Sequence, residues 1–116
     1  MKTAITLSLG LNILVLIPVC FGLWSNAPWA SESYGTDGVA RGILLAVYAS
    51  ILIASIGLMI KPLPSAVCTL LALQVAYKLL SPLAAGTLSN PVILSNLGIA
   101  GVHVITLAVI GRALWR

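Results

Sequence analysis

Four long apolar runs, separated by short polar connections, dominate the pattern of the chain. The clearest lies at residues 39–60, where a polar turn and Arg41 lead into an almost unbroken aliphatic series. A helix of about 20 residues rises ~1.5 Å per residue and covers the ~30 Å hydrocarbon core of a bilayer. The pattern therefore predicts an all-α membrane protein, a bundle of four transmembrane helices forming one membrane domain over residues 1–116.

The four runs set the bounds of the expected spans, which are about residues 4–24, 39–60, 64–81 and 91–114. The first run has the polarity of a signal peptide, but it is longer than a typical signal core and is expected to remain a span. Pro64 suits the first turn of the third helix, and Ser81-Pro82 is expected to end it.

Residues 25–38 form the longest polar connection, and we expect this aromatic loop to lie along the outer membrane surface. Tryptophan and tyrosine prefer the headgroup level. At its end, Thr36 or Asp37 is a candidate N-cap for the second span, since a side-chain oxygen there can accept an orphaned N–H. Asp37 and Arg41 are four residues apart, so they are expected to pair on one helix face.

The basic residues predict the orientation of the bundle. One side of the membrane collects four cations and no acid, whereas the other carries two cations and both acids of the chain. The first group is Lys2, Lys61, Arg112 and Arg116, and the second is Arg41 and Lys78 with Glu32 and Asp37. Short basic loops stay in the cytoplasm, so both termini are expected to be cytoplasmic.

Composition supports the membrane class and narrows the partners. Hydrophobic residues make up 60% of the chain and charged residues 7%, against about 25% charged in soluble domains. The net charge of +4 comes from singly scattered Lys and Arg residues, which do not make the dense basic face of a nucleic-acid-binding protein. Expected partners are membrane lipids and other integral membrane subunits, with the bacterial cytoplasmic (inner) membrane as location.

Polar side chains gather in the outer halves of the predicted helices. If they face inward, they form an outward-opening pocket that could bind an anionic solute or a lipid headgroup. Its candidate residues are Asp37, Arg41, Tyr48, Gln74, Tyr77, Lys78 and Asn96. An ionisable residue within a membrane often has a function. Both cations also lie near helix ends, where long basic side chains can act as interfacial anchors.

His103 is the only histidine and falls near the middle of the fourth span. It could hydrogen-bond between helices, as could Asn12 and Gln74, or contact a proton or substrate. It could also ligate a haem or pigment together with a partner protein. A bis-histidine haem within the chain is excluded, because a second histidine is lacking.

The small residues Ser95, Gly98 and Gly101 would allow a close helix contact on the fourth span, either within the fold or with a partner protein. Cys20 and Cys68 are expected at opposite membrane faces, too far apart for a disulfide. No catalytic, metal or cofactor motif is found, and the two acids lie in one loop. We therefore expect no enzyme activity, no cofactor and no metal site.

Two short segments carry a family resemblance: YGTDGVARG at residues 34–42 and YKLL at residues 77–80. With the four-span layout, the chain resembles the broad DoxX-like group of small bacterial four-helix membrane proteins, many of which have no assigned activity. The resemblance implies the architecture and little about function. The leading expectation is an accessory or scaffolding subunit of a larger membrane complex. The alternative is a small homo-oligomeric transporter or channel that uses the outer pocket.

Overall fold

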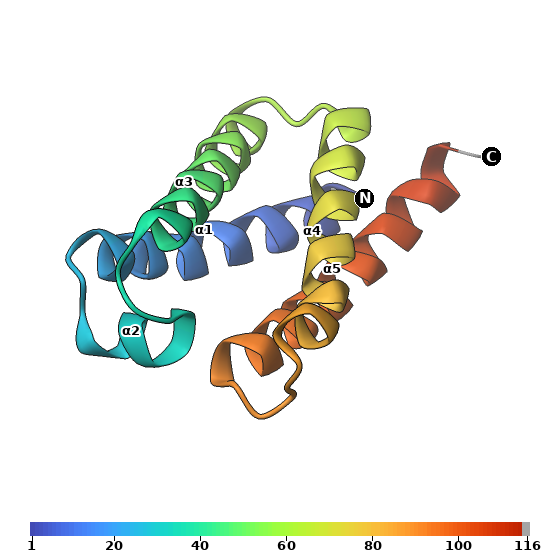
Figure 1. Cartoon of the computed structure of the whole chain (residues 1–116). Helices are drawn as coiled ribbons and strands as arrows, with labels where there is room; N and C mark the ends of the chain where they lie inside the picture. Colours follow the sequence, from blue (N-terminus) through green and yellow to red (C-terminus); the bar gives the residue numbers. More distant parts are fainter. Residues whose placement is uncertain (115–116) are drawn as a thin grey trace.

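Helices account for nearly all of the structure, a computed structural model that describes residues 1–114 (Figure 1). The five helices of this part are α1 (Lys2–Trp24), α2 (Pro28–Tyr34), α3 (Val39–Ile60), α4 (Pro64–Ala85) and α5 (Pro91–Leu114). Four of them, all except α2, are long and apolar enough to cross a membrane. The prediction of an all-α chain with four such helices is confirmed.

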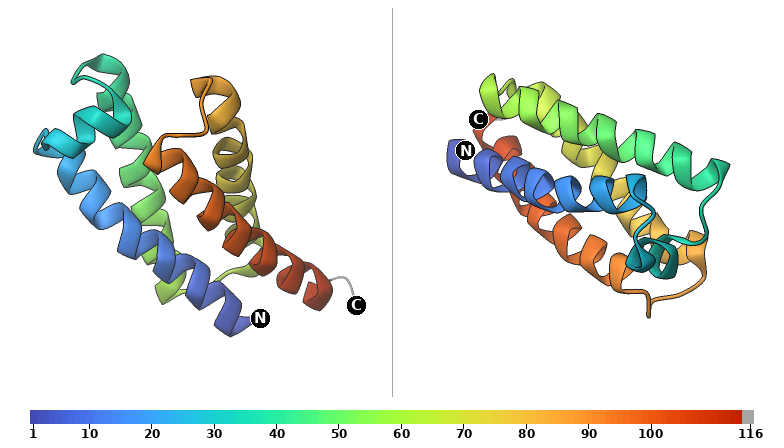
Figure 2. Two further views of the ribbon diagram at one scale, coloured as in Figure 1. Left: turned by 90° about the horizontal axis from the view of Figure 1, so that it is seen from below. Right: turned by 90° about the vertical axis from the view of Figure 1, so that its left-hand side faces the viewer.

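The long helices associate as two pairs. α1 packs along α3, and α4 packs along α5; the pairs join mainly through α1 and α5. α3 and α4 are consecutive in the chain and linked by a short turn, yet they make few contacts (Figures 1 and 2). The N-terminus and the end of α5 lie together at one end of the molecule, which we call the terminal end, whereas α2 lies at the other, the α2 end (Figure 2).

α4 is longer than predicted, because the expectation that Ser81-Pro82 ends the helix is wrong. Proline removes one backbone donor, and the chain tolerates this loss. The Ser81 hydroxyl donates to the Tyr77 carbonyl at 2.8 Å, and the helix continues to Ala85. Its actual end is Gly86, in the left-handed conformation with φ of 71°, which glycine adopts without steric cost.

The segment at residues 25–38 contains a helix, where the sequence predicted only a surface loop. α2 starts at a proline, as short helices often do, and buries Ala30 completely. The N-cap of α3 is Gly38, without a side-chain cap, so the prediction of Thr36 or Asp37 at this position is wrong. The Asp37 carboxylate instead pairs with Arg41 at 3.4 Å, and the predicted pairing of these two residues is confirmed.

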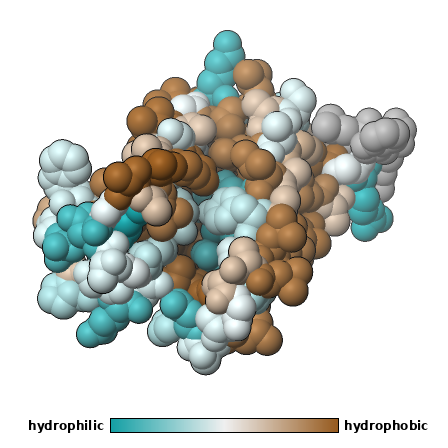
Figure 3. Space-filling view, viewed as in Figure 1, coloured by the Kyte–Doolittle hydropathy of each residue, from teal (hydrophilic) through white to brown (hydrophobic). Residues whose placement is uncertain are grey.

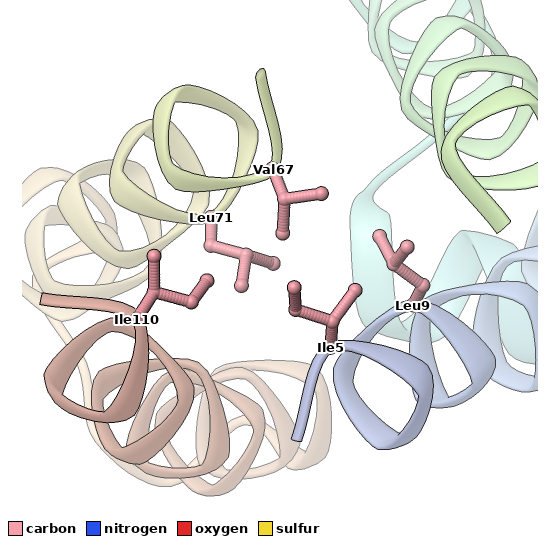
Figure 4. Packing of buried hydrophobic residues seen from close by; sticks show 5 residues of the cluster. All are labelled: Ile5, Leu9, Val67, Leu71 and Ile110. Atoms are coloured by element: carbon pink, nitrogen blue, oxygen red, sulfur yellow. The ribbon is translucent and has the colours of Figure 1, made fainter. Parts of the chain in front are cut away.

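The interior is layered along the bundle. At the terminal end, aliphatic side chains from three helices form a cluster that contains no polar group (Figure 4). Its members are Ile5 and Leu9 of α1, Val67 and Leu71 of α4, and Ile110 of α5. A second cluster lies toward the α2 end and includes Leu16, Leu23, Ala30, Tyr48 and Ile51. Eight polar or charged side chains of the described residues are buried as well, among them Asn12, Lys78 and His103.

Gly22 brings α2 against α1, which leads to a first prediction. A Cβ atom at Gly22 would overlap the ring of Trp29, so Gly22→Val should displace α2. Overpacking typically costs about 1–3 kcal/mol. The only glutamate, Glu32, is exposed on α2, so cleavage by a glutamate-specific protease should become about tenfold faster as local opening increases.

The matched control is Gly10→Ala, because the nearest atom to a Cβ there is Met59 Cε at 3.8 Å, an ordinary contact. Its cleavage rate should equal that of the wild type. Equal rates for all three proteins would contradict the close packing of Trp29 on Gly22.

Candidate functional site

A hydrogen-bond network centred on His103 links the four long helices. The Nε2 atom of His103 on α5 lies 2.9 Å from Asn12 Oδ1 on α1 and 3.1 Å from Gln74 Oε1 on α4. Asn12 Nδ2 in turn donates to Ser55 Oγ on α3 at 3.1 Å. All four residues are buried. Hydrogen bonding between helices, one of the roles predicted for His103, is therefore present in the structure.

The network fixes the proton on His103 and leaves one donor free. Because Asn12 donates to Ser55, its Oδ1 faces the histidine, and two oxygens then require Nε2 to carry the proton. Gln74 Nε2 and His103 Nδ1 are buried without a hydrogen-bond partner among the described residues. Since buried polar groups are nearly always paired, the amide of Gln74 is available to a ligand oxygen.

A small cavity lies beside this network, and Lys78 is the charged group in its wall. The cavity has a volume of about 20 Å³, roughly that of one water molecule. Its polar lining residues are Asn12, Tyr34, Tyr48, Gln74, Tyr77, Lys78 and Asn96. The structure therefore brings five of the predicted pocket residues together: Tyr48, Gln74, Tyr77, Lys78 and Asn96.

The Lys78 ammonium is buried without a counter-charge. The residue is 5% exposed, its Nζ donates to Asn96 Oδ1 at 3.3 Å, and it lies 4.9 Å from the centre of the Tyr77 ring. Within residues 1–114, the ion pair of Arg41 and Asp37 is the only one. Buried charges are normally paired, so an anion in the cavity would supply the missing partner.

A wider vestibule connects the cavity to the α2 end. It has a volume of about 390 Å³ and shares Tyr34, Tyr48 and Asn96 with the cavity. The rings of Tyr34 and Tyr48 meet edge to face at 5.9 Å. Burial, with a smaller effect from Tyr48, raises the pKa of the Tyr34 hydroxyl. This group therefore keeps its proton at neutral pH and can donate it to a bound oxygen.

Arg41 and Asp37, which were predicted in the pocket, lie outside it and hold α2 in place. The guanidinium of Arg41 donates to Asn26 Oδ1 at 2.5 Å, to Ser31 Oγ at 3.1 Å and to the Gly35 carbonyl at 3.1 Å. Planar guanidinium groups suit such multiple contacts. The carboxylate of Asp37 is largely exposed. These two residues act on the site indirectly, through the position of α2.

A hydrogen bond from Asn90 also connects α2 to the start of α5. Asn90 Nδ2 donates to the Ser33 carbonyl at 2.9 Å, and its Oδ1 accepts the Val92 N–H at 2.8 Å. Both Ser33 and Asn90 line the vestibule, and sequence reasoning missed them as well as Tyr34. Asn90 directly precedes Pro91, a helix-start signal, but the partner on α2 could not be read from the sequence.

The small residues of α5 do not pack within the chain. Ser95, Gly98 and Gly101 are exposed, and a Cβ atom on either glycine would meet nothing within 4 Å. The sequence left two roles open for these small residues, a close contact with another helix of the chain or with a partner protein. Within the described residues, they make no such contact with another helix. Both cysteines are free, as predicted.

Comparison with models of protein families, with curated proteins and with solved structures finds no match to this chain. The resemblance to DoxX-like proteins stays a prediction, as do the absence of a cofactor and the absence of enzyme activity. Functional inference therefore rests on the geometry of the cavity, the vestibule and the network beneath them.

The network generates a second prediction. Asn12→Ala removes two buried hydrogen bonds that join three helices, and interhelical hydrogen bonds in membranes are worth about 0.6 kcal/mol on average, with a maximum near 1.7. Detergent-solubilised protein should lose about 1–3 kcal/mol of unfolding free energy in a denaturant titration, since polar partners are left unpaired.

Ser50→Ala is the control, because this exposed hydroxyl bonds only to the Ala46 carbonyl of its own helix. Its unfolding free energy should change little. The same small change for Asn12→Ala would show that the network does not hold the helices together.

Proposed function

We propose that the protein is a membrane-embedded binding protein for a small oxyanion, whose charged oxygen sits in the cavity at Lys78. The observation that carries this proposal is the buried ammonium without an acidic partner. The cavity has room for about one oxygen atom of the solute, and the vestibule shares three of its lining residues. Binding, rather than chemistry, is the proposed task.

The donors around the cavity suit an anion. Lys78 supplies charge, the tyrosine hydroxyls supply neutral donors, and Gln74 has an amide N–H without a partner. Hydrogen bonds that include an ionised group are shorter and about twice as strong as neutral ones. A carboxylate or phosphate oxygen would therefore satisfy Lys78 and Gln74 together, which a neutral ligand would do less well.

The terminal end argues for binding over conduction. The five-residue aliphatic cluster lies between α1, α4 and α5 at that end, and its side chains carry no polar group. One helical turn past the network around His103, the buried hydroxyls of Ser8 and Thr106 bond to each other at 2.6 Å, and the aliphatic cluster provides no polar route beyond them. Transport would require the helix pairs to separate at this cluster.

The proposed setting is the bacterial cytoplasmic membrane, with the α2 end outside and both termini in the cytoplasm. Three basic residues support this orientation: Lys2, Lys61 and Arg112. Each lies at or near a helix terminus that belongs to the terminal end of the bundle, and no acid is close in sequence. The positive-inside rule places such residues in the cytoplasm. In this orientation the vestibule opens toward the outer surface.

The third prediction tests the role of Lys78. Purified protein should bind acetate, followed by calorimetry, and Lys78→Met should weaken the affinity about ten- to a hundredfold. This range corresponds to the loss of one hydrogen bond to a charged group. Methionine keeps an unbranched apolar stem of similar length, so packing around the cavity is preserved.

Lys61→Met is the control, because this lysine is exposed in the α3–α4 turn. It carries the same change of net charge and should leave acetate binding as in the wild type. Equal weakening by both substitutions would point to a general surface-charge effect and would contradict a site at Lys78.

A second candidate function is that of an accessory subunit in a larger membrane complex. The observation that favours it is the outer face of α5, where exposed glycines leave open space and large apolar side chains such as Leu94 and Ile105 are exposed beside them. A neighbouring helix can approach closely at such a face. This function is compatible with an oxyanion site, because the α5 face lies outside the vestibule.

The fourth prediction concerns this face. If another subunit packs there, native mass measurement after gentle detergent extraction should find a hetero-complex, and Gly98→Leu should dissociate it. The control is Gly57→Leu, a glycine on α3 that also has open space around it. A lone monomer or homo-oligomer in the wild type would remove the accessory-subunit function.

A further inference from the structure

The seam between α3 and α4 is the least closed part of the bundle. These helices make few contacts with each other although a short turn joins them, and polar surface is visible between apolar ridges in the space-filling view (Figure 3). An apolar groove of about 470 Å³ follows the seam. Its lining residues are Val47, Ser50 and Ile51 of α3 with Leu70, Leu73 and Tyr77 of α4.

The groove meets the candidate site at Tyr77, which lines both the groove and the cavity that contains Lys78. From Tyr77 to Leu70 the groove descends seven residues along α4, about 10 Å, away from the α2 end. Two of its lining residues carry a hydroxyl: Tyr77, at the upper end, and Ser50, whose hydroxyl is already bonded to the Ala46 carbonyl. The groove is thus an apolar track with a cationic group beside its upper end.

We propose that the bound oxyanion is the carboxylate of a fatty acid, whose chain lies in the groove between α3 and α4. This inference rests on the proposed function and names its ligand class. The carboxylate oxygen would occupy the cavity at Lys78, and the acyl chain would run along Val47, Ile51 and Leu73 toward the bilayer centre.

The positive charge of Lys78 and the course of the groove both favour a fatty acid over an uncharged helix or lipid. Neither the cavity nor the groove has an acidic lining residue, so a carboxylate complements the only charge present. The chain direction from headgroup level to bilayer centre is that of a lipid already in the membrane. Each helix contributes one row of side chains to the groove, which matches a single acyl chain.

The test compares palmitate, its methyl ester and acetate on the purified protein, with native mass spectrometry as the measurement. Palmitate should bind at least tenfold more tightly than acetate, because each buried methylene adds to affinity. Methyl palmitate should bind at least tenfold less tightly than palmitate, since it lacks the charge that Lys78 needs. Lys78→Met should remove this difference between palmitate and its ester.

Val47→Trp tests the groove without touching the cavity. Val47 is 47% exposed, so the larger ring fills the groove and does not disturb the core. Palmitate affinity should fall about tenfold, as expected when roughly two methylenes lose their burial, while acetate affinity stays the same. Leu79→Trp is the control, because Leu79 is also exposed on α4 but lies outside the groove.

The outcomes separate this inference from the function it rests on. Unchanged palmitate affinity in Val47→Trp, or equal binding of the ester, would overturn the fatty-acid inference; acetate binding that still depends on Lys78 would then keep the oxyanion site. If neither acetate nor palmitate binding depends on Lys78, the proposed function fails, and the fatty-acid inference fails with it.

Discussion

The hydrogen bonds of His103 are the interaction on which the interior of this bundle depends. Apolar side chains give little specificity between helices in lipid, because the surroundings are equally apolar. A buried polar group that must find a partner is more selective. Asn12 and Gln74 supply those partners on α1 and α4, and Asn12 extends the network to Ser55 on α3. The network therefore joins all four long helices at one level.

With the helices fixed at this level, the two ends of the bundle differ in character. Toward the terminal end the interior is mostly aliphatic, with Ile5, Leu71 and their neighbours, and the buried hydroxyls of Ser8 and Thr106 bond to each other. Toward the α2 end, the helix pairs leave a cavity and a vestibule, and α2 covers part of them with Tyr34. The ties from Arg41 and Asn90 position that tyrosine. The site thus has a rigid floor and a cover held by polar contacts.

The helices were predictable and their exact packing was not, for physical reasons that particular residues illustrate. Apolar runs long enough to span a bilayer gave the starts of α3, α4 and α5 and the ends of α1 and α3 correctly. The end of α4 was missed, because the helix continues past Pro82 to Ala85. Tyr48, Gln74 and Lys78 share a cavity, as their stripes indicated. Arg41 does not join them, because its hydrogen-bond partners lie in α2 and in the residues on either side of it. α2 has only seven residues, too few for a periodic signal that predicts a helix.

Lys78 connects these levels of structure. It lies one helical turn above Gln74 on α4, and both side chains line the cavity. Its ammonium finds one amide oxygen and one aromatic ring, which is little compensation for a buried charge. A lysine that served only as an anchor would extend to the bilayer surface. Its burial beside an unpaired amide donor is the feature from which we propose a ligand that brings negative charge.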